Sequence, residues 1–453
     1  MKFRLNLSRL AALAASATFA LTAANATAQS LIRDAEVERT ISMMATPILK
    51  AAGYAPDSIN ILLLNDRTLN AFVFGGKNMI LNTGLLTRVE TPEALMGVIA
   101  HEMGHIAGGH LTRRQINAEA LQGPLLVGAI LAAVAGAASG RGDVAVAGAL
   151  GVQGAAQRSF LAYTRGEESA ADQAGASYME QAGLDPAASL DVLRIFRGQE
   201  VFAAGNVDPY ARTHPLSGDR MQLLEDRVAR SSAKGGKASE ELHYWHARMR
   251  AKLAGFLSRP ARTLSILETS ENPNSEFNVL TRAIAYHLLP SPRDALAEVN
   301  RLIELRPNDP YYYELKGQIL FESGDAKAAV APYRKASQLA PNEPLIRGSL
   351  GRALLALNDP AANAEALTAL EDATRTDPGE IAVLRDLALA YARDGQEGKA
   401  ALATAQRFAF QSSPKDTYRH ATRALDLLPV GSPGWLKADD IRAVTERSIR
   451  AKN

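Results

Sequence analysis

The chain of 453 residues contains no cysteine. This absence excludes disulfide bonds, thiolate metal ligands, a cysteine nucleophile and an N-terminal cysteine that carries a lipid.

An excess of one charge is also lacking. The 50 basic and 48 acidic residues give a formal net charge of +2, and no long basic run occurs. Nothing therefore favours a nucleic-acid partner. The hydrophobic share of 47% is typical of a soluble globular protein. At this length we expect two or three domains.

No convincing membrane span is present, but the first residues have the pattern of a secretory signal peptide. Lys2, Arg4 and Arg9 precede a short apolar stretch at 10–21, and the small residues at 26–28 form a cleavage site. The apolar stretch is too short to span a membrane. The alternative is an amphipathic start to the first domain. We predict a signal peptide at 1–28 and a periplasmic location, with secretion as the other exported destination.

The region 29–230 is predicted to form the first domain. Its pattern indicates a helix over 31–52, a buried strand over 59–64, and a hairpin with strands at 71–74 and 79–81. Thr91 is expected to cap a helix whose first turn contains Pro92. A further helix is expected over 167–182, ended by Gly183.

A segment rich in glycine and alanine lies at 123–156. Its two apolar stretches, 125–138 and 144–156, are each shorter than the roughly 20 residues of a transmembrane helix. We interpret it as a buried or membrane-apposed helical pair that can cover a cleft and make peripheral membrane contact. A re-entrant hairpin is the alternative.

The polar stretch 231–239 is predicted to be an interdomain linker. Beyond it, the Pro-Asn pairs that begin at Pro273, Pro307 and Pro341 recur every 34 residues. That period, with Gly317 and Tyr333 at the expected offsets, predicts a tetratricopeptide repeat domain over 240–453. An unrelated helical bundle is the alternative, and the register is uncertain where residues are inserted near 358–363.

Histidine is scarce, with eight in the chain, yet three lie in the stretch AHEMGHIAGGH at 100–110. On a helix, His101 and His105 project from one face and can share a zinc ion. A catalytic zinc needs three protein ligands and a water molecule, and Glu102 is placed to act as the base. A purely structural helix is the alternative.

The third ligand is not given by this motif alone. A histidine at 111 would complete one zinc-protease pattern, but that residue is Leu111, and His110 points about 100° away around a helix. We therefore interpret His110 as a packing or supporting residue. Glu168 is the better candidate, with Asp172 on the same helical face to hold a ligand histidine. Glu167 is the alternative ligand. If neither acid binds a metal, the two belong to a solvated acidic face of the helix.

The motif HEMGH, the Glu168-x-x-x-Asp172 spacing and the stretch THPLSGDR at 213–220 together resemble a family of zinc metallopeptidases. This family includes HtpX-type heat-shock proteases and CaaX prenyl proteases. The leader and the repeats are similar to its periplasmic branch.

The resemblance implies one Zn²⁺ ion per chain, bound by His101, His105 and Glu168, with Glu102 as the catalytic base. It further implies His214 as a reversible fourth ligand that acts as a latch, and Arg220 as a support of the cleft. The stretch Asn70, Ala71 and Phe72 falls where the family pairs a strand with an extended substrate. From the sequence alone, His214 could equally be a loop residue that contacts backbone.

We therefore expect a mostly helical α+β zincin-type domain with a small sheet, followed by an all-α repeat solenoid. The resemblance implies misfolded or stalled outer-membrane β-barrel proteins and the barrel assembly machinery as partners. The rival hypothesis is an assembly chaperone or scaffold whose protease site is usually silent. A weaker alternative is a zinc hydrolase that acts on non-peptide substrates.

Overall fold

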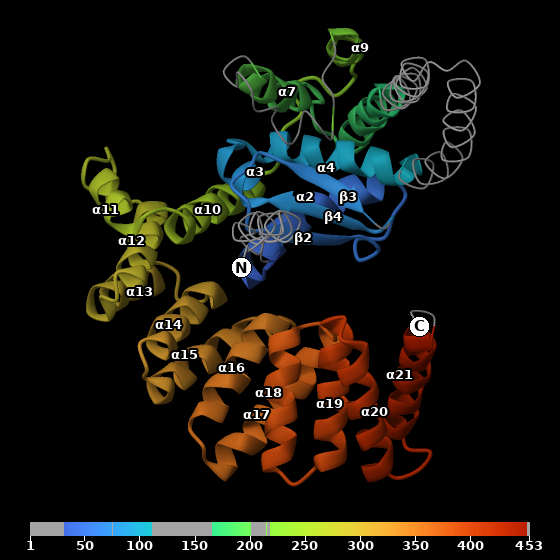
Figure 1. Ribbon diagram of the computed structural model, residues 1–453. Helices are drawn as coiled ribbons and strands as arrows, with labels where there is room; N and C mark the ends of the chain where they lie inside the picture. Colours follow the sequence, from blue (N-terminus) through green and yellow to red (C-terminus); the bar gives the residue numbers. More distant parts are fainter. Residues whose placement is uncertain (1–30, 75, 111–164, 201–213, 215–217, 451–453) are drawn as a thin grey trace, which may run out of the picture. The chain divides into compact units, whose positions relative to one another are not determined.

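The computed structural model of the protein describes residues 31–74, 76–110, 165–200, 214 and 218–450 (Figure 1). The predicted signal peptide and the segment 123–156 lie outside these residues. The chain divides into two compact units, which are described separately. The first contains residues up to 32 and 42–243, and the second contains 33–41 and 244–453.

The first unit has a small mixed sheet. Its strand order is β1-β2-β4-β3, with β2 parallel to β4 and the other two pairs antiparallel. The predicted strand and hairpin are confirmed. The strands are β1 (Leu31–Ile32), β2 (Asn60–Leu64), β3 (Ala71–Phe74) and β4 (Asn78–Asn82).

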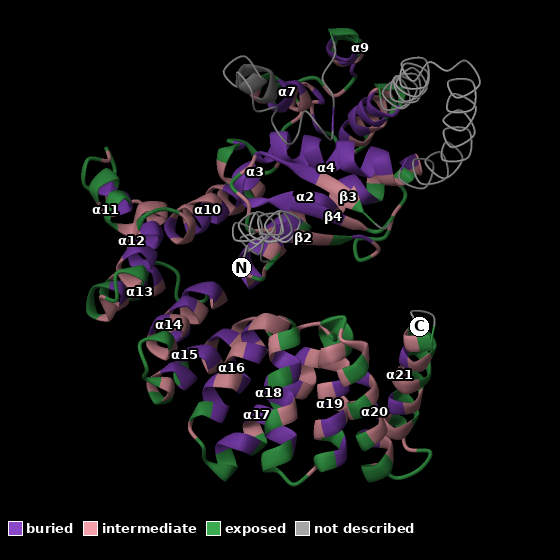
Figure 2. Ribbon diagram, in the orientation of Figure 1, coloured by how far each residue is buried: buried purple, intermediate pink, exposed green. Residues whose placement is uncertain are grey.

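Helix α2 (Ala35–Ala51) lies between β1 and β2 in the chain, and helices α3 (Thr83–Arg88) and α4 (Pro92–Ala107) follow β4. The predicted cap is confirmed, since the Thr91 side chain accepts a hydrogen bond from the Ala94 amide at 3.3 Å. Every residue of α4 from Pro92 to His105 is buried (Figure 2). A helix buried all round belongs to the interior of a unit. The HEMGH motif therefore lies in the core.

A second helix, over residues 165–181, packs backbone to backbone against α4. A Cβ on Gly104 would lie 2.8 Å from the Ala171 Cα, and a Cβ on Gly175 would lie 3.1 Å from the Ala100 carbonyl carbon. Glycine at these two contacts is what permits the approach. The helix ends as predicted before Gly183, whose φ of +75° suits glycine.

Among the described residues, the first unit also contains helices α7 (Ala187–Glu200) and α9 (Gly218–Ala229). The stretch 231–239, predicted as a linker, is hydrogen-bonded to this unit: the Asp185 amide donates to the Gly236 carbonyl, and the Ala238 amide donates to Glu93 Oε1 at 2.8 Å. Helix α10 (Glu240–Leu257) then leads into the second unit.

The second unit is an all-α solenoid of consecutive helices, as predicted. Its 34-residue period has a steric basis, because a Cβ on Gly317 would lie 2.8 Å from the Tyr333 ring. The insertion near 358–363 lengthens α17 to 17 residues, whereas α15 has 14. The helices are α11 (Pro260–Glu268), α12 (Glu276–Leu288), α13 (Pro292–Leu305), α14 (Pro310–Glu322), α15 (Ala326–Leu339), α16 (Pro344–Ala356), α17 (Pro360–Thr376), α18 (Ile381–Arg393), α19 (Glu397–Phe410), α20 (Pro414–Leu427) and α21 (Pro433–Arg450).

Residues 33–41, from the start of α2, belong to this second unit. Buried ion pairs join them to α10: Arg248 Nε lies 2.5 Å from Glu36 Oε1, and Lys252 Nζ lies 2.8 Å from Asp34 Oδ2. Across the described residues, no helix is both long and apolar enough to cross a membrane.

Candidate metal centre

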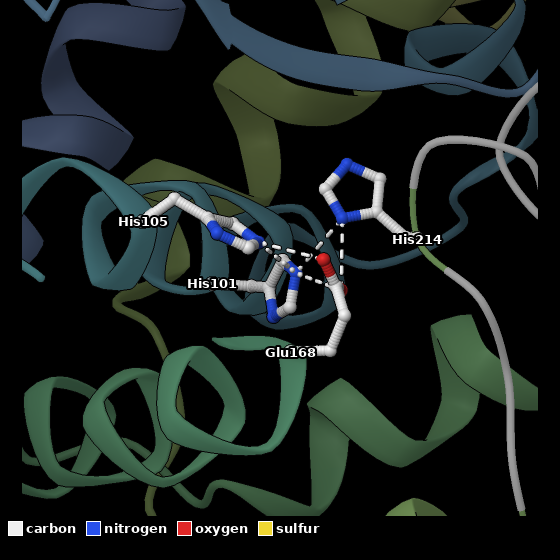
Figure 3. Close-up of side chains that lie close together, drawn as sticks. All are labelled: His101, His105, Glu168 and His214. Carbon is white, nitrogen blue, oxygen red and sulfur yellow. Dashed lines mark hydrogen bonds and ion pairs between the residues drawn. The ribbon is translucent and has the colours of Figure 1, made fainter. Parts of the chain in front are cut away.

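Four buried side chains converge beside α4 (Figure 3). His101 and His105 come from successive turns of α4, Glu168 comes from the helix over 165–181, and His214 comes from the segment before α9. Each is at most 6% exposed. Two helices in backbone contact thus place donors that are more than sixty residues apart in the sequence beside one another.

The donor separations fit a tetrahedral ion. A zinc ion at about 2.0–2.1 Å from each donor would separate any two donors by about 3.3 Å. His101 Nε2 lies 3.1 Å from His105 Nε2, and Glu168 oxygens lie 3.3 Å from each of these nitrogens. His214 Nδ1 lies 3.3 Å from His101 Nε2 and 3.0 Å from Glu168 Oε2. Nitrogen and oxygen donors at these separations suit zinc.

Two residues hold the donors in place. Asp172 Oδ1 lies 2.9 Å from His101 Nδ1, on the side of the ring away from the cluster. Arg220 on α9 donates to both Asp172 oxygens, at 2.5 and 2.9 Å, and its Nη1 lies 3.1 Å from Glu168 Oε2. Arg220 is 2% exposed. It therefore joins the supporting carboxylate to the ligand carboxylate.

The charges inside the protein follow from these contacts. Burial opposes protonation of His101, but hydrogen bonds to Asp172 and Glu168 outweigh it and raise the pKa of His101 to about 9. Burial lowers the pKa of His105. Burial alone would raise the pKa of Glu168, but the charge of His214 and hydrogen bonds from His101 and His105 hold this pKa far below its usual range. Glu168 is thus an anionic donor.

Glu102 lies next to the cluster and is fully buried. Neither carboxylate oxygen has a hydrogen-bond partner among the described residues. His214 Nε2 lies 3.4 Å from Glu102 Oε1. A buried carboxylate without a donor is costly unless a ligand or a reacting group meets it. Its position suits a base beside a bound ion.

His110 is not part of the four-residue cluster. Its Nδ1 lies 2.9 Å from His105 Nδ1, so it contacts His105 through the ring nitrogen that does not face the cluster. If His105 binds an ion through Nε2, its Nδ1 must carry the proton and donate to His110 Nδ1. The geometry matches the supporting position that the sequence indicated.

Comparison with known proteins adds the family. Residues 31–228 match Peptidase family M48. This segment is an M48 peptidase domain. The chain is similar to the Beta-barrel assembly-enhancing protease of Yersinia pestis, with 24% identity over 355 residues, 77% of this chain and 71% of that protein. For the protein of the same name from Escherichia coli strain K12, the identity is 23% over 335 residues, 72% of this chain and 66% of that protein.

Two solved structures show weaker similarity. MamA is 18% identical with a TM-score of 0.30, over 34% of this chain and 88% of that chain. YrrB, described as a TPR protein with an unusual peptide-binding site, is 17% identical with a TM-score of 0.32, over 39% of this chain and 91% of that chain.

The M48 domain thus carries the metal-capable cluster. Of the two acids at 167–168, Glu168 belongs to the cluster, and Glu167 does not. The predicted substrate stretch also has a defined place: Asn70 is buried just before β3, and Ala71 and Phe72 lie on β3, the last strand in the order of the sheet. The contact of Arg220 with Glu168 was not anticipated from sequence, although the GDR triplet at 218–220 marked the right segment.

Proposed function

We propose that this protein is a zinc metalloendopeptidase. One Zn²⁺ ion is held by His101, His105 and Glu168, and Glu102 is the catalytic base. The observation that carries this proposal is the set of donor separations near 3.3 Å, which match tetrahedral zinc within a buried site. The M48 peptidase domain supports the reaction class.

When bound, zinc supplies Lewis-acid activation of water and of the scissile carbonyl. Glu102 accepts the proton of the attacking water on a carboxylate oxygen and delivers it to the leaving amine. Asp172 keeps the proton of His101 on Nδ1, so that Nε2 faces the ion. Strand β3 lies at the end of the sheet order and offers its backbone to an extended peptide. Recognition through backbone allows many sequences.

His214 is proposed to be a latch. Its Nδ1 lies within the donor cluster, in the position that a fourth ligand takes. With His214 in that position, the place of the catalytic water is filled, and the enzyme rests inactive. A substrate or partner opens the site only by binding the open state more tightly than the closed one.

The proposed setting is the periplasm. The predicted leader supports export, and the names of the relatives support a role with outer-membrane β-barrel proteins. In this role the enzyme degrades misfolded or stalled barrel proteins. The repeat solenoid supplies a docking surface for them and for the barrel assembly machinery.

A second candidate is an assembly scaffold with a normally silent protease site. The position of His214 Nδ1, 3.0 Å from Glu168 Oε2, favours this state of the site. The two functions differ in what Glu102 does. A scaffold keeps its cellular role without this carboxylate, whereas a protease does not.

The deciding experiment compares the wild-type chain with Glu102→Gln and Glu168→Ala. Glu102→Gln should keep stoichiometric zinc but lose casein cleavage, because the amide cannot accept the proton. Glu168→Ala should lose zinc, because two imidazoles remain. Full cleavage by Glu102→Gln would refute the assignment of the base, and full zinc in Glu168→Ala would move the third ligand elsewhere.

A further inference from the structure

The second unit, called the repeat unit below, contains a groove of about 380 Å³ that the peptidase chemistry does not use. It is lined by residues of three consecutive helices, α18, α19 and α20. Part of the lining is aliphatic, including Ala388, Leu389 and Ala400, and part is cationic. Leu389 is 45% exposed.

Three guanidinium groups line this groove, and two of them already have carboxylate partners. Arg423 pairs with Glu397 at 2.8 Å, and Arg385 pairs with Asp386 at 2.7 Å. Arg407 differs. Its Nε is buried and has no hydrogen-bond partner among the described residues, and its guanidinium carbon lies 4.6 Å from the centroid of the Phe408 ring.

His420 also lines the groove, stacked on Phe408 with ring centroids 5.4 Å apart. Burial and the charges of Arg419, Arg423 and Arg407 lower the pKa of His420 below its ordinary value of 6.5. The imidazole is therefore neutral at pH 7. Among the described residues, Arg407 is the one arginine of this groove that has no carboxylate partner.

A half-buried guanidinium that has no carboxylate partner among the described residues, beside aliphatic side chains, suits a ligand with one negative charge and an adjacent apolar group. Guanidinium and carboxylate groups match in a planar, bidentate geometry. The last residue of a peptide carries both a carboxylate and a side chain, so an apolar last residue supplies the charge and the apolar group together within this small groove. An internal aspartate or glutamate brings the charge without the apolar group. A phosphate carries more charge than Arg407 alone offsets.

We propose that this groove binds the C-terminal residue of a peptide that ends in an apolar side chain, with the terminal carboxylate on Arg407. The repeat unit would thereby recognise free chain ends. This site is independent of the peptidase reaction, since none of its residues belongs to the metal centre.

The test measures binding of a fluorescein-labelled hexapeptide that ends in leucine and contains no acidic residue. The protein is the full chain with Glu102→Gln, which prevents cleavage, and fluorescence anisotropy gives Kd. The same peptide with an amidated C-terminus should bind at least about tenfold more weakly, because a charge-assisted contact is lost. This arm changes only the ligand and does not depend on the folding of a variant.

Arg407→Gln should weaken binding of the free-acid peptide by a similar factor and leave the Kd of the amidated peptide unchanged. Leu389→Glu should also weaken the free acid, through repulsion at an exposed position. Arg375→Gln is the matched control: this arginine is on α17, outside the groove, and its side chain is 74% exposed. It should bind as the parent does.

Three results would overturn the proposal. They are equal Kd values for the acid and the amide, unchanged binding in a folded Arg407→Gln chain, and equally tight binding of an amidated peptide with an internal aspartate. Inorganic phosphate and acetate are also tested as competitors of the peptide. If phosphate displaces the peptide at a far lower concentration than acetate does, the groove is a general anion site instead. Because Glu102→Gln is used throughout, loss of the proposed peptidase function would not mimic any of these results.

Discussion

At the scale of single residues, we expect the proposed metal centre to depend on Asp172, a carboxylate that is not itself a proposed ligand. Asp172 fixes His101 through Nδ1 and is itself held by Arg220. Asp172→Asn should weaken zinc binding by about 10–100-fold, as the loss of such supporting groups does elsewhere. Competition with a chromophoric chelator measures this affinity. Asp191→Asn, with a 61% exposed side chain on α7, is the control. Unchanged affinity in Asp172→Asn would remove Asp172 from the centre.

A second prediction at this scale concerns Glu314 in the repeat unit. Burial raises the pKa of Glu314 to about 7, although the charge of Lys252 opposes this, and Asp34 and Glu36 add to it. The folded state thus binds this proton more tightly than the unfolded state. The stability that the neutral Glu314 carboxyl contributes is fully present below pH 4.5 and is lost as the pH rises through about 7. A glutamine at this position cannot ionise, so Glu314→Gln should not lose stability over this pH range.

We therefore expect Glu314→Gln to gain stability over the wild type at pH 8, on the order of 1–3 kcal/mol, and not at pH 4.5. Both tryptophans, Trp245 and Trp435, belong to the second unit, so urea unfolding followed by their fluorescence reports this unit. A stability difference that does not change with pH would contradict the assignment.

At the scale of elements, contact between α4 and the helix over 165–181 positions the proposed ligands His101, His105 and Glu168. Gly104→Ala would place a methyl group 2.8 Å from the Ala171 Cα, so the helices must separate. We expect a loss of about 1–3 kcal/mol in the free energy of unfolding, as in other overpacked cores, and weaker zinc binding. Gly166→Ala is the matched control, because a Cβ there meets nothing within 4 Å. Thermal unfolding and zinc titration of both variants decide; equal behaviour would contradict this role.

The elements also show what a sequence can predict. The Thr91 cap, the strand at 60–64 and the 34-residue repeat were predictable because each depends on neighbouring residues. The HEMGH motif is local in the same way. The place of Glu168 was predictable only through its spacing to Asp172. The contact of Arg220 with Glu168 depends on how α9 packs, and no local pattern encodes it.

At the scale of the whole molecule, the second unit is built from two stretches of the chain that are not consecutive. Residues 33–41 belong to the repeat unit, although the next residues of α2 belong to the peptidase unit. Nothing in the sequence of α2 predicts this, because its partners Arg248 and Lys252 lie more than two hundred residues away. Only the folded chain shows that the repeat unit includes an N-terminal segment.

This arrangement predicts a strong effect of Glu36 on the repeat unit. Glu36→Ala leaves the buried Arg248 and Lys252 short of one carboxylate, which should cost about 3–5 kcal/mol. Glu38→Ala, two residues away, removes a partly exposed contact with Arg33 and should cost about 1 kcal/mol or less. Urea unfolding with tryptophan fluorescence measures both. Equal effects would show that the buried pairs add no special stability.

The burial of the four-residue cluster has a kinetic consequence. His101, His105, Glu168 and His214 are each at most 6% exposed, and α4 has no residue facing solvent between Pro92 and His105. A chelator in solution cannot reach an ion held there until the surrounding helices open. Zinc exchange is then governed by the rate of local opening and not by the chelator. Above a modest chelator concentration, the rate of metal loss should no longer depend on that concentration.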